Sequence, residues 1–321
     1  MINQNILICG VVKNAAKYLE KSLALCIKTG ELFENYKIII YENNSTDATK
    51  DILKYYRDKS HFVIIMEDLS YDDIKKNSKA WAYTEITGSD HPCRMEQIAN
   101  ARNRIITECK KQDYNDYKYI MFIDLDAEEW SLDGIADSFR RIDEWDAIFA
   151  NGLQGEENKY YDLFAYRNLN ENIFGGEILG EYNFPINYSR AIYILPNDPN
   201  LKTVVSAFGG IGIYKKSLFT HDIQYGCLVT EKIISYYTTI LSNTMKIDDF
   251  MLKIIAEPCP KFPGGYKTYF KYNNEYHTIH WKNNSGYDNV VLCEHVSVNI
   301  PLFFKGYRLR INPKMTYRWT G

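Results

Sequence analysis

Short apolar runs alternate with segments of helical periodicity over the first 150 residues of this chain. The runs have the length of buried strands and lie at residues 5–12, 36–41, 62–66, 118–123 and 146–150. Between them, apolar residues recur every three or four positions, as in residues 16–27 and 94–111. Helices that alternate with fully apolar strands are typical of an α/β fold, so we predict a mostly parallel sheet flanked by helices.

The pattern changes after residue 151. Apolar stretches at 204–214, 266–281 and 290–298 have the composition of strands, and residues 231–241 have helical periodicity. We therefore expect a mixed sheet in the C-terminal half. Residues 71–92 are polar and contain glycine and proline, which predicts a long loop over the sheet. Because no low-complexity linker divides the chain, we predict one domain over residues 1–321, made of the halves 1–150 and 151–321.

Composition narrows the possible functions. Of the 321 residues, 45% are hydrophobic, and the formal net charge of −3 offers no basic surface, so we expect no nucleic-acid partner. The seven cysteines are scattered without a C-x-x-C pair, which favours free thiols in a reducing compartment and therefore a cytoplasmic protein. The N-terminus lacks the features of a signal peptide, and no apolar run is long enough to span a bilayer, so no transmembrane segment is expected.

Two aspartates follow the apolar run at 118–123. Asp124 and Asp126 are two positions apart, and alternate residues of a strand share one face. Their carboxylates would therefore lie side by side and hold one Mn²⁺ or Mg²⁺ ion, since hard oxygen ligands suit these cations. An isolated Asp-x-Asp sequence is also common as a plain charged exit from a strand. The residues around it must decide between the two interpretations.

Arg102 lies on the apolar stripe of the helical segment 94–111. It is seven residues from Met95 and from Cys109, which both belong to the stripe. A guanidinium that faces the core needs an anionic partner, which the aspartates after the next strand or a bound phosphate would provide. The alternative is an arginine whose stem packs on the protein while its head reaches water.

Two further constellations lie in the C-terminal half. Glu294 and His295 are adjacent, and they are either a metal site or a core histidine beside a surface glutamate. A regular strand would point them to opposite faces, so we expect a turn here that admits both to one cleft. Gly209 and Gly210 interrupt the run 204–214, which indicates the close approach of a ligand or another backbone, or a β-bulge.

Six short motifs occur in an order that resembles a known family. They are Tyr-Glu-Asn-Asn-Ser-Thr-Asp-Ala-Thr (41–49), Ala-Asn-Ala-Arg-Asn (99–103), Phe-Ile-Asp-Leu-Asp (122–126), Phe-Gly-Gly-Ile-Gly-Ile-Tyr (208–214), Cys-Glu-His-Val (293–296) and Ile-Asn-Pro (311–313). In this order they resemble the GT-A-fold glycosyltransferases, and among these the group that contains the fungal capsule-associated α-1,3-mannosyltransferases. The likeness extends over nearly the whole chain, except for residues 215–290.

The resemblance implies a Rossmann-like GT-A fold whose two halves bind different substrates. Residues 1–150 would bind a UDP- or GDP-linked sugar, and residues 151–321 would bind a glycan or other hydroxyl acceptor. The residues that the resemblance places at the substrates are Val12, Glu42, Asn44, Ser45, Asp47, Arg102, Asp124, Gly209 and Gly210.

The resemblance also implies roles in the chemistry. Asp124 and Asp126 would bind Mn²⁺ or Mg²⁺, with His295 as a further ligand. Arg102 and the cation would neutralise the leaving diphosphate. Glu294 is the candidate base that would deprotonate the acceptor hydroxyl in an inverting reaction. The chain lacks the x-Glu-Asp motif that many members carry after the glycines, so the sequence leaves the base open.

Two other functions agree with parts of the sequence. A sugar-nucleotide pyrophosphorylase shares the α/β layout and a metal carboxylate, but it normally has a glycine-rich loop after its first strand, where residues 6–13 contain only Gly10. A catalytically silent carbohydrate-binding relative would have lost metal ligands, whereas all the candidate ligands are present. A metal-dependent glycosyltransferase is therefore the leading prediction.

Overall fold

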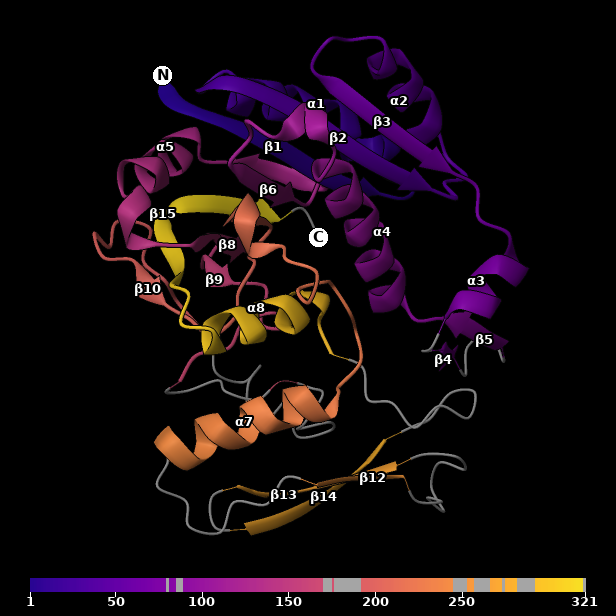
Figure 1. The fold of residues 1–321 in the computed structure, drawn as a ribbon, viewed down its shortest axis with the longest axis vertical. Helices are drawn as coiled ribbons and strands as arrows, with labels where there is room; N and C mark the ends of the chain where they lie inside the picture. The colour runs from indigo at the N-terminus through magenta and orange to yellow at the C-terminus, as the bar shows by residue number, and fades with distance from the viewer. Residues whose placement is uncertain are drawn as a thin grey trace.

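The computed structural model describes residues 1–78, 81–84, 89–169, 175, 192–244, 253–256, 266–272, 275–281 and 292–319. Within this part of the chain, a ten-stranded sheet forms the centre and helices lie on both of its faces (Figure 1). The main path through the sheet is β10-β15-β8-β11-β6-β1-β2-β3, while β7 pairs with β15 and β9 with β8. The predicted α/β fold is confirmed.

One half of the sheet is parallel. It contains β1 (Ile2–Val12), β2 (Phe33–Asn43), β3 (Phe62–Glu67) and β6 (Tyr119–Ile123). The side chains of β1 alternate between two cores, with Ile6 and Ile8 on one face and Leu7 and Cys9 on the other. Because both faces of these strands are buried, their sequences are apolar at nearly every position.

The other half of the sheet is mixed, as predicted. β11 (Ile211–Lys215) lies antiparallel between β6 and β8 (Ala147–Gln154), and β15 (Leu309–Trp319) runs parallel to β8. Three short strands complete this half: β7 (Ala127–Trp130), β9 (Lys159–Tyr160) and β10 (Lys202–Thr203). The last strand of the chain thus returns to the interior of the sheet.

The helices form two groups that cover opposite faces of the sheet. α1 (Ala16–Gly30), α2 (Thr49–Arg57) and α5 (Leu132–Arg140) share a core with one face of the sheet. α4 (Arg94–Cys109), α7 (Glu231–Thr244) and α8 (Glu294–Phe304) share the core on the other face. None of the helices in the described part of the chain has the length and apolar content needed to cross a bilayer.

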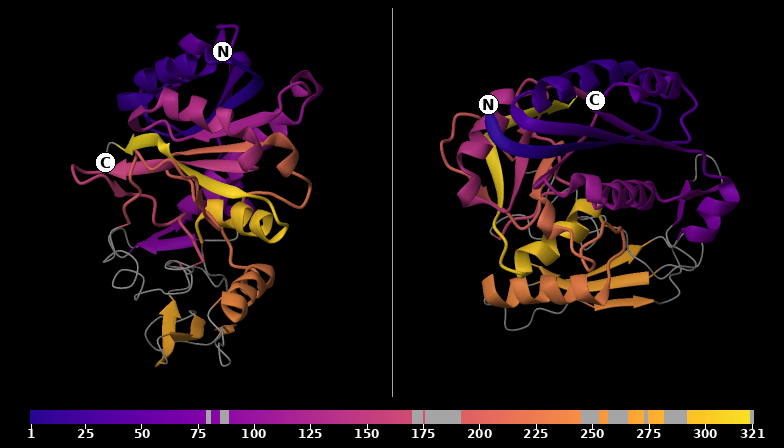
Figure 2. Two further views of the ribbon diagram at one scale, coloured as in Figure 1. Left: turned by 90° about the vertical axis from the view of Figure 1, so that its left-hand side faces the viewer. Right: turned by 45° about the horizontal axis from the view of Figure 1, so that its top comes forward.

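A second, small sheet lies with α7 at the end of the molecule remote from β1–β3 (Figures 1 and 2). Its strands are β12 (Lys253–Ala256), β13 (Tyr266–Tyr272) and β14 (Glu275–Trp281), and all neighbours pair antiparallel. The predicted helix at 231–241 and the predicted strands within 266–281 are confirmed. The functional division into two halves stays a prediction.

Residues 71–92 are not the long loop that their polarity predicted. The described part of this segment contains α3 (Tyr71–Asn77) and a hairpin of β4 (Trp81–Thr84) and β5 (Ser89–Pro92). α3 begins at Ser70, whose hydroxyl oxygen accepts the backbone N–H of Asp73 at 3.1 Å. A serine cap followed by two aspartates in the first turn stabilises a short helix despite a polar sequence.

The prediction of a strand at 290–298 was also wrong. Residues 290 and 291 lie outside the described part, and α8 starts at Glu294 after an extended Cys293. This helix is buried on nearly every side, with Val296, Val298 and Ile300 fully inaccessible. An apolar segment without periodicity fits a buried helix as well as a strand, and the β-branched residues favoured the wrong choice.

Candidate functional site

The two aspartates lie in the turn that follows β6 and not on the strand itself. The backbone N–H of Asp124 donates to the carbonyl oxygen of Gly210 at 2.9 Å. Burial raises the pKa of Asp124 to about 7 against the opposing effect of Arg102, and the charge of Asp126 raises it further. The carboxylates are therefore close enough to repel each other, as expected for ligands of one cation.

Arg102 connects these aspartates to α8. Its side chain is only 3% exposed. Nη2 lies 3.2 Å from Oδ1 of Asp124, and Nε lies 3.3 Å from Oε1 of Glu294. The guanidinium also lies over the ring of Phe208, 4.9 Å from its centroid. The prediction that Arg102 faces the core toward an anionic partner is confirmed.

Glu294 and His295 lie in the first turn of α8, so a helix start replaces the expected turn and admits both to the cluster around Arg102. The His295 ring stacks on Phe208 at 3.7 Å between centroids, and its Nε2 lies 3.4 Å from Oε1 of Glu294. Burial, aided by the charge of Arg102, holds the pKa of His295 well below its ordinary value. The imidazole is therefore neutral at pH 7.

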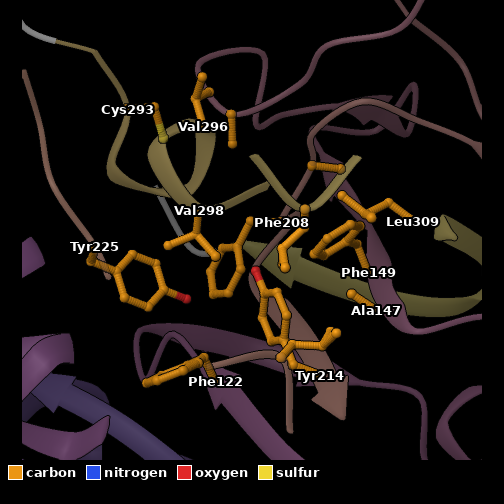
Figure 3. Packing of buried hydrophobic residues seen from close by; sticks show 14 of the residues in the cluster. Phe122, Ala147, Phe149, Phe208, Tyr214, Tyr225, Cys293, Val296, Val298 and Leu309 are labelled. Atoms are coloured by element: carbon orange, nitrogen blue, oxygen red, sulfur yellow. The ribbon is translucent and has the colours of Figure 1, made fainter. Parts of the chain in front are cut away.

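Aromatic side chains fill the space between β6 and α8. Figure 3 shows the rings of Phe122, Phe208, Tyr214 and Tyr225 grouped below the start of the helix. Phe122 and Tyr225 meet edge to face, with centroids 5.5 Å apart. Such an apolar wall keeps water from one side of the ion cluster and strengthens the electrostatic interactions inside it.

A divalent cation would find oxygen ligands here but no preformed cage. Among the residues that the structure describes, no three His, Cys, Asp or Glu side chains lie close enough together to hold a metal. Mg²⁺ in nucleotide sites needs only one or two carboxylates, because phosphate oxygens and water complete its shell. The Asp124–Asp126 pair fits this requirement. Neither ring nitrogen of His295 has a hydrogen-bond partner within the same described set, but its role as a ligand stays a prediction.

Gly209 and Gly210 form the turn that leads into β11, so the strand expected at 204–214 begins only at residue 211. Their φ angles are +63° and +88°, in the left-handed region that favours glycine. A Cβ on Gly209 would lie 2.4 Å from the carbonyl oxygen of Ala150, and one on Gly210 would lie 2.4 Å from the ring of Tyr317. Close packing within the protein explains both glycines, and their contact with a substrate stays a prediction.

Asp162 belongs to the same site, although the sequence did not reveal it. Its Oδ2 accepts the N–H of Gly209 at 3.0 Å, and its Oδ1 accepts the N–H of Ala165 at 3.2 Å. Burial raises the pKa of Asp162 to about 6, and the charge of Glu294 adds to the rise. The contact with Gly209 spans 47 residues, so no local motif could have shown it.

The segment predicted to bind the nucleoside is fixed by its own hydrogen bonds. Glu42 is fully buried, and its Oε1 accepts the N–H of Ser45 at 2.7 Å. The side-chain amide of Asn44 pairs with the backbone of Leu69 at 2.7 and 3.2 Å. Asp47 accepts backbone N–H groups from the starts of α1 and α2. These side chains shape the turn after β2, and their contact with a donor stays a prediction.

A pocket of about 770 Å³ lies beside this segment, between the ends of β2 and β3 and the helices α3 and α4. We call it the α3–α4 pocket. Val12, at the end of β1, is 6% exposed and is not among its lining residues. The lining residues are Tyr41, Asn43, Glu67, Asp68, Leu69, Asp73, Ile74, Asn77, Ser78, Gln97, Asn100, Ala101, Asn103, Arg104 and Thr107. Its volume lies in the range of small-ligand sites, and its amide groups both donate and accept hydrogen bonds.

Comparison with known proteins identifies the family. A family model described as Cryptococcal mannosyltransferase 1 matches residues 6–225. The chain belongs to this family. The match includes Arg102, Asp124, Asp126 and both glycines, whereas α8 and β15 lie beyond its end. The family resemblance found in the motifs is confirmed.

Solved structures similar to this family member include S. aureus TarS and a mannosyltransferase. S. aureus TarS 1–349 in complex with UDP-GlcNAc is 15% identical, with a TM-score of 0.38, and the match covers 70% of this chain and 49% of that chain. Mannosyltransferase PcManGT from Pyrobaculum calidifontis, in complex with GDP-Man and Mn²⁺, is 12% identical, with a TM-score of 0.38 and coverage of 70% and 48%. The chain spans about half the length of these structures. No curated protein matches it.

Proposed function

We propose that this protein is a glycosyltransferase that moves a hexose from a UDP- or GDP-linked sugar to a hydroxyl group of a glycan or other acceptor. The observation that carries the proposal is the buried Arg102 with its two carboxylate partners beside the Asp124–Asp126 turn. Membership of the Cryptococcal mannosyltransferase 1 family supports the class of reaction. A buried cation next to paired carboxylates suits the point where a diphosphate and a divalent metal meet.

Asp124 and Asp126 would hold Mn²⁺ or Mg²⁺ through their carboxylates. The cation, when bound, supplies charge neutralisation for the departing nucleoside diphosphate. Arg102 would assist from the protein side, since its Nη1 has no hydrogen-bond partner in the described part of the chain. A buried N–H without a partner is costly, and a phosphate oxygen would satisfy it.

The nucleoside would occupy the α3–α4 pocket. α4 borders this pocket through Gln97 and Asn100 and carries Arg102 into the ion cluster, so one helix would contact both the nucleoside and the diphosphate. Amides match the mixed donors and acceptors on the edges of uracil and guanine. The pocket therefore supports a nucleotide donor without deciding between the two bases.

Glu294 is the proposed catalytic base of an inverting reaction. Its Oε1 faces Arg102, while its Oε2 accepts the weak S–H donor of Cys293 at 3.6 Å. That second oxygen is the one that would accept the proton of the acceptor hydroxyl. We further propose His295 as an additional cation ligand, because a neutral imidazole is the form that binds metals.

Thermal unfolding in the presence of UDP- and GDP-sugars, with Mn²⁺, Mg²⁺ or EDTA, tests the proposal. A donor at about 100 times its Kd stabilises the native state by about 2.7 kcal/mol. Asp126→Asn should abolish transfer and the metal-dependent part of this stabilisation. Asp116→Asn, at an exposed aspartate, is the matched control and should change neither.

The outcomes separate the competing functions. Transfer that continues in excess EDTA would refute the role of the cation. Formation of a nucleotide sugar from a nucleoside triphosphate and a sugar phosphate would instead identify a pyrophosphorylase. Sugar binding without turnover would identify a catalytically silent relative.

We also propose a cytoplasmic location. The six cysteines in the described part of the chain, Cys9, Cys26, Cys93, Cys109, Cys227 and Cys293, are buried free thiols. Free thiols are typical of reducing compartments. To test this, cells would be quenched with acid, and the denatured protein would be labelled with a maleimide. The labelling would show whether the thiols are free in the cell.

A further inference from the structure

Both carboxylate oxygens of Asp126 accept hydrogen bonds from β15. The hydroxyl of Tyr317 donates to Oδ1 at 3.2 Å, and the indole N–H of Trp319 donates to Oδ2 at 3.4 Å. Residues two apart on a strand share a face, so β15 presents both donors to the same carboxylate. The Tyr317 hydroxyl also lies 3.1 Å from the carbonyl oxygen of Asp124, and its single proton is therefore shared across the Asp124–Asp126 turn.

The two donors are themselves fixed by a column of stacked rings. Tyr317 is fully buried and stacks on Trp130 and on Tyr161, with centroids 6.5 and 6.1 Å apart. Trp319 stacks on the Tyr161 ring, with centroids 5.6 Å apart and an interplanar angle of 8°. At Gly210 only a hydrogen fits beside the Tyr317 ring. Folding thus places both donors before any cation arrives, so binding would not have to order them.

We propose that Tyr317 and Trp319 are positioning residues that hold the Asp126 carboxylate in the orientation needed to bind a divalent cation. The inference rests on the metal role proposed above for Asp126. Asp124 and Asp126 carry like charges when both are ionised, which favours orientations that separate the two carboxylates, and the two donors oppose such a rotation of Asp126. Partners that hydrogen-bond to a ligating carboxylate in this way fix its orientation toward the metal.

Mn²⁺ alone is the probe for this proposal. The free ion is titrated against the full chain and measured by its EPR signal, in the absence and in the presence of UDP or GDP. Loss of a partner that orients a ligating carboxylate weakens metal binding about 10- to 100-fold. Tyr317→Phe and Trp319→Phe should each raise the Kd for Mn²⁺ at least about tenfold. Trp319→Phe removes the N–H donor together with part of the indole ring system, but it keeps an aromatic ring that can stack on Tyr161.

Two buried residues provide matched controls. Tyr114→Phe removes a hydroxyl that donates to Oε1 of Glu108 at 3.4 Å, and Trp145→Phe removes an indole N–H that donates to the carbonyl of Ser138 at 2.8 Å. Both changes should lower thermal stability and leave the Kd for Mn²⁺ unchanged. Equal weakening of Mn²⁺ binding by these controls would overturn the proposal, because general destabilisation would then explain the effect.

The remaining outcomes distinguish this inference from the proposed function. If Asp126→Asn abolishes Mn²⁺ binding while Tyr317→Phe and Trp319→Phe bind as the unmodified chain does, the positioning role is wrong and the metal role stands. If the unmodified chain binds no Mn²⁺ with or without nucleotide, or if Asp126→Asn binds it normally, the metal role fails and the positioning role fails with it.

Discussion

Replacing Arg102 by methionine tests whether a buried ion cluster anchors α4 to the carboxylates. The guanidinium lies 3.2 Å from Asp124 and 3.3 Å from Glu294, whose side chain is 6% exposed. Removing one member of a buried ionic cluster costs about 3–5 kcal/mol, because an uncompensated charge stays in the interior. We expect the free energy of unfolding of Arg102→Met to fall by that amount at pH 8, as measured by urea denaturation with an unchanged m-value.

Arg104→Met is the matched control, on the same helix and with the same new side chain. Arg104 is 56% exposed and pairs with Glu67 at the rim of the α3–α4 pocket. Exposed ion pairs contribute about 0–1 kcal/mol, so this change should have a small effect on unfolding. Equal losses for Arg102→Met and Arg104→Met would refute the argument that the apolar stripe of α4 carries a buried charge.

The pH dependence of the Arg102→Met effect provides an internal check. Burial raises the pKa of Asp124 to about 7 even though Arg102 opposes the rise, so the variant should have a still higher pKa. A carboxyl whose pKa is raised in the folded state binds more protons there than in the unfolded state, and stability falls as pH rises up to the folded pKa. The difference between the two proteins should therefore be larger at pH 9 than at pH 6. A difference that is constant or shrinks would contradict the assignment.

Three further predictions concern the chemistry. Glu294→Gln should leave the donor-induced thermal shift intact and slow transfer at least about a hundredfold, since general bases contribute 10²–10⁴; an unchanged rate would remove Glu294 as the base. His295→Ala should weaken Mn²⁺-dependent donor binding in the same thermal-shift assay, and unaltered binding would identify a structural histidine. The affinity for Mn²⁺ should rise between pH 6 and pH 8, because Asp124, with a pKa of about 7, must lose its proton to bind a cation. A pH-independent titration would contradict this.

Sequence patterns predicted the parts of the fold in which one element carries its own signal. The fully apolar runs of β1 and β6 indicated strands buried on both faces, and both lie inside the sheet. On α4, the spacing of Arg102 from Met95 and Cys109 was enough to place the arginine on the buried face. Neither inference needed knowledge of what lies opposite. The sequence predicted the nearby aspartates as partners of Arg102, but it did not predict Glu294 as a partner, because Glu294 is 192 residues away.

β15 was missed although its sequence contains the signal. Leu309, Ile311, Met315, Tyr317 and Trp319 alternate with more polar residues, which is the period of a strand. A proline at 313 interrupts the pattern, and the register against β8 shifts between residues 312 and 316, where the strand is irregular. Proline within a run lowers the expectation of a strand, so a local rule hid a real element.

The groups that orient Asp126 come from a part of the chain that its own motif does not reach. Tyr317 lies 191 residues and Trp319 lies 193 residues beyond Asp126, and both follow the end of the family match at residue 225. Glu294 lies there too, so Arg102 contacts one carboxylate inside the matched region and one outside it. Tyr317 and Trp319 hydrogen-bond to Asp126, and Glu294 shares Arg102 with Asp124. A change in β15 or α8 would therefore alter the chemistry of the Asp-x-Asp motif without altering the motif. Differences in metal use between members of the family should therefore map to these C-terminal elements as readily as to the motif itself.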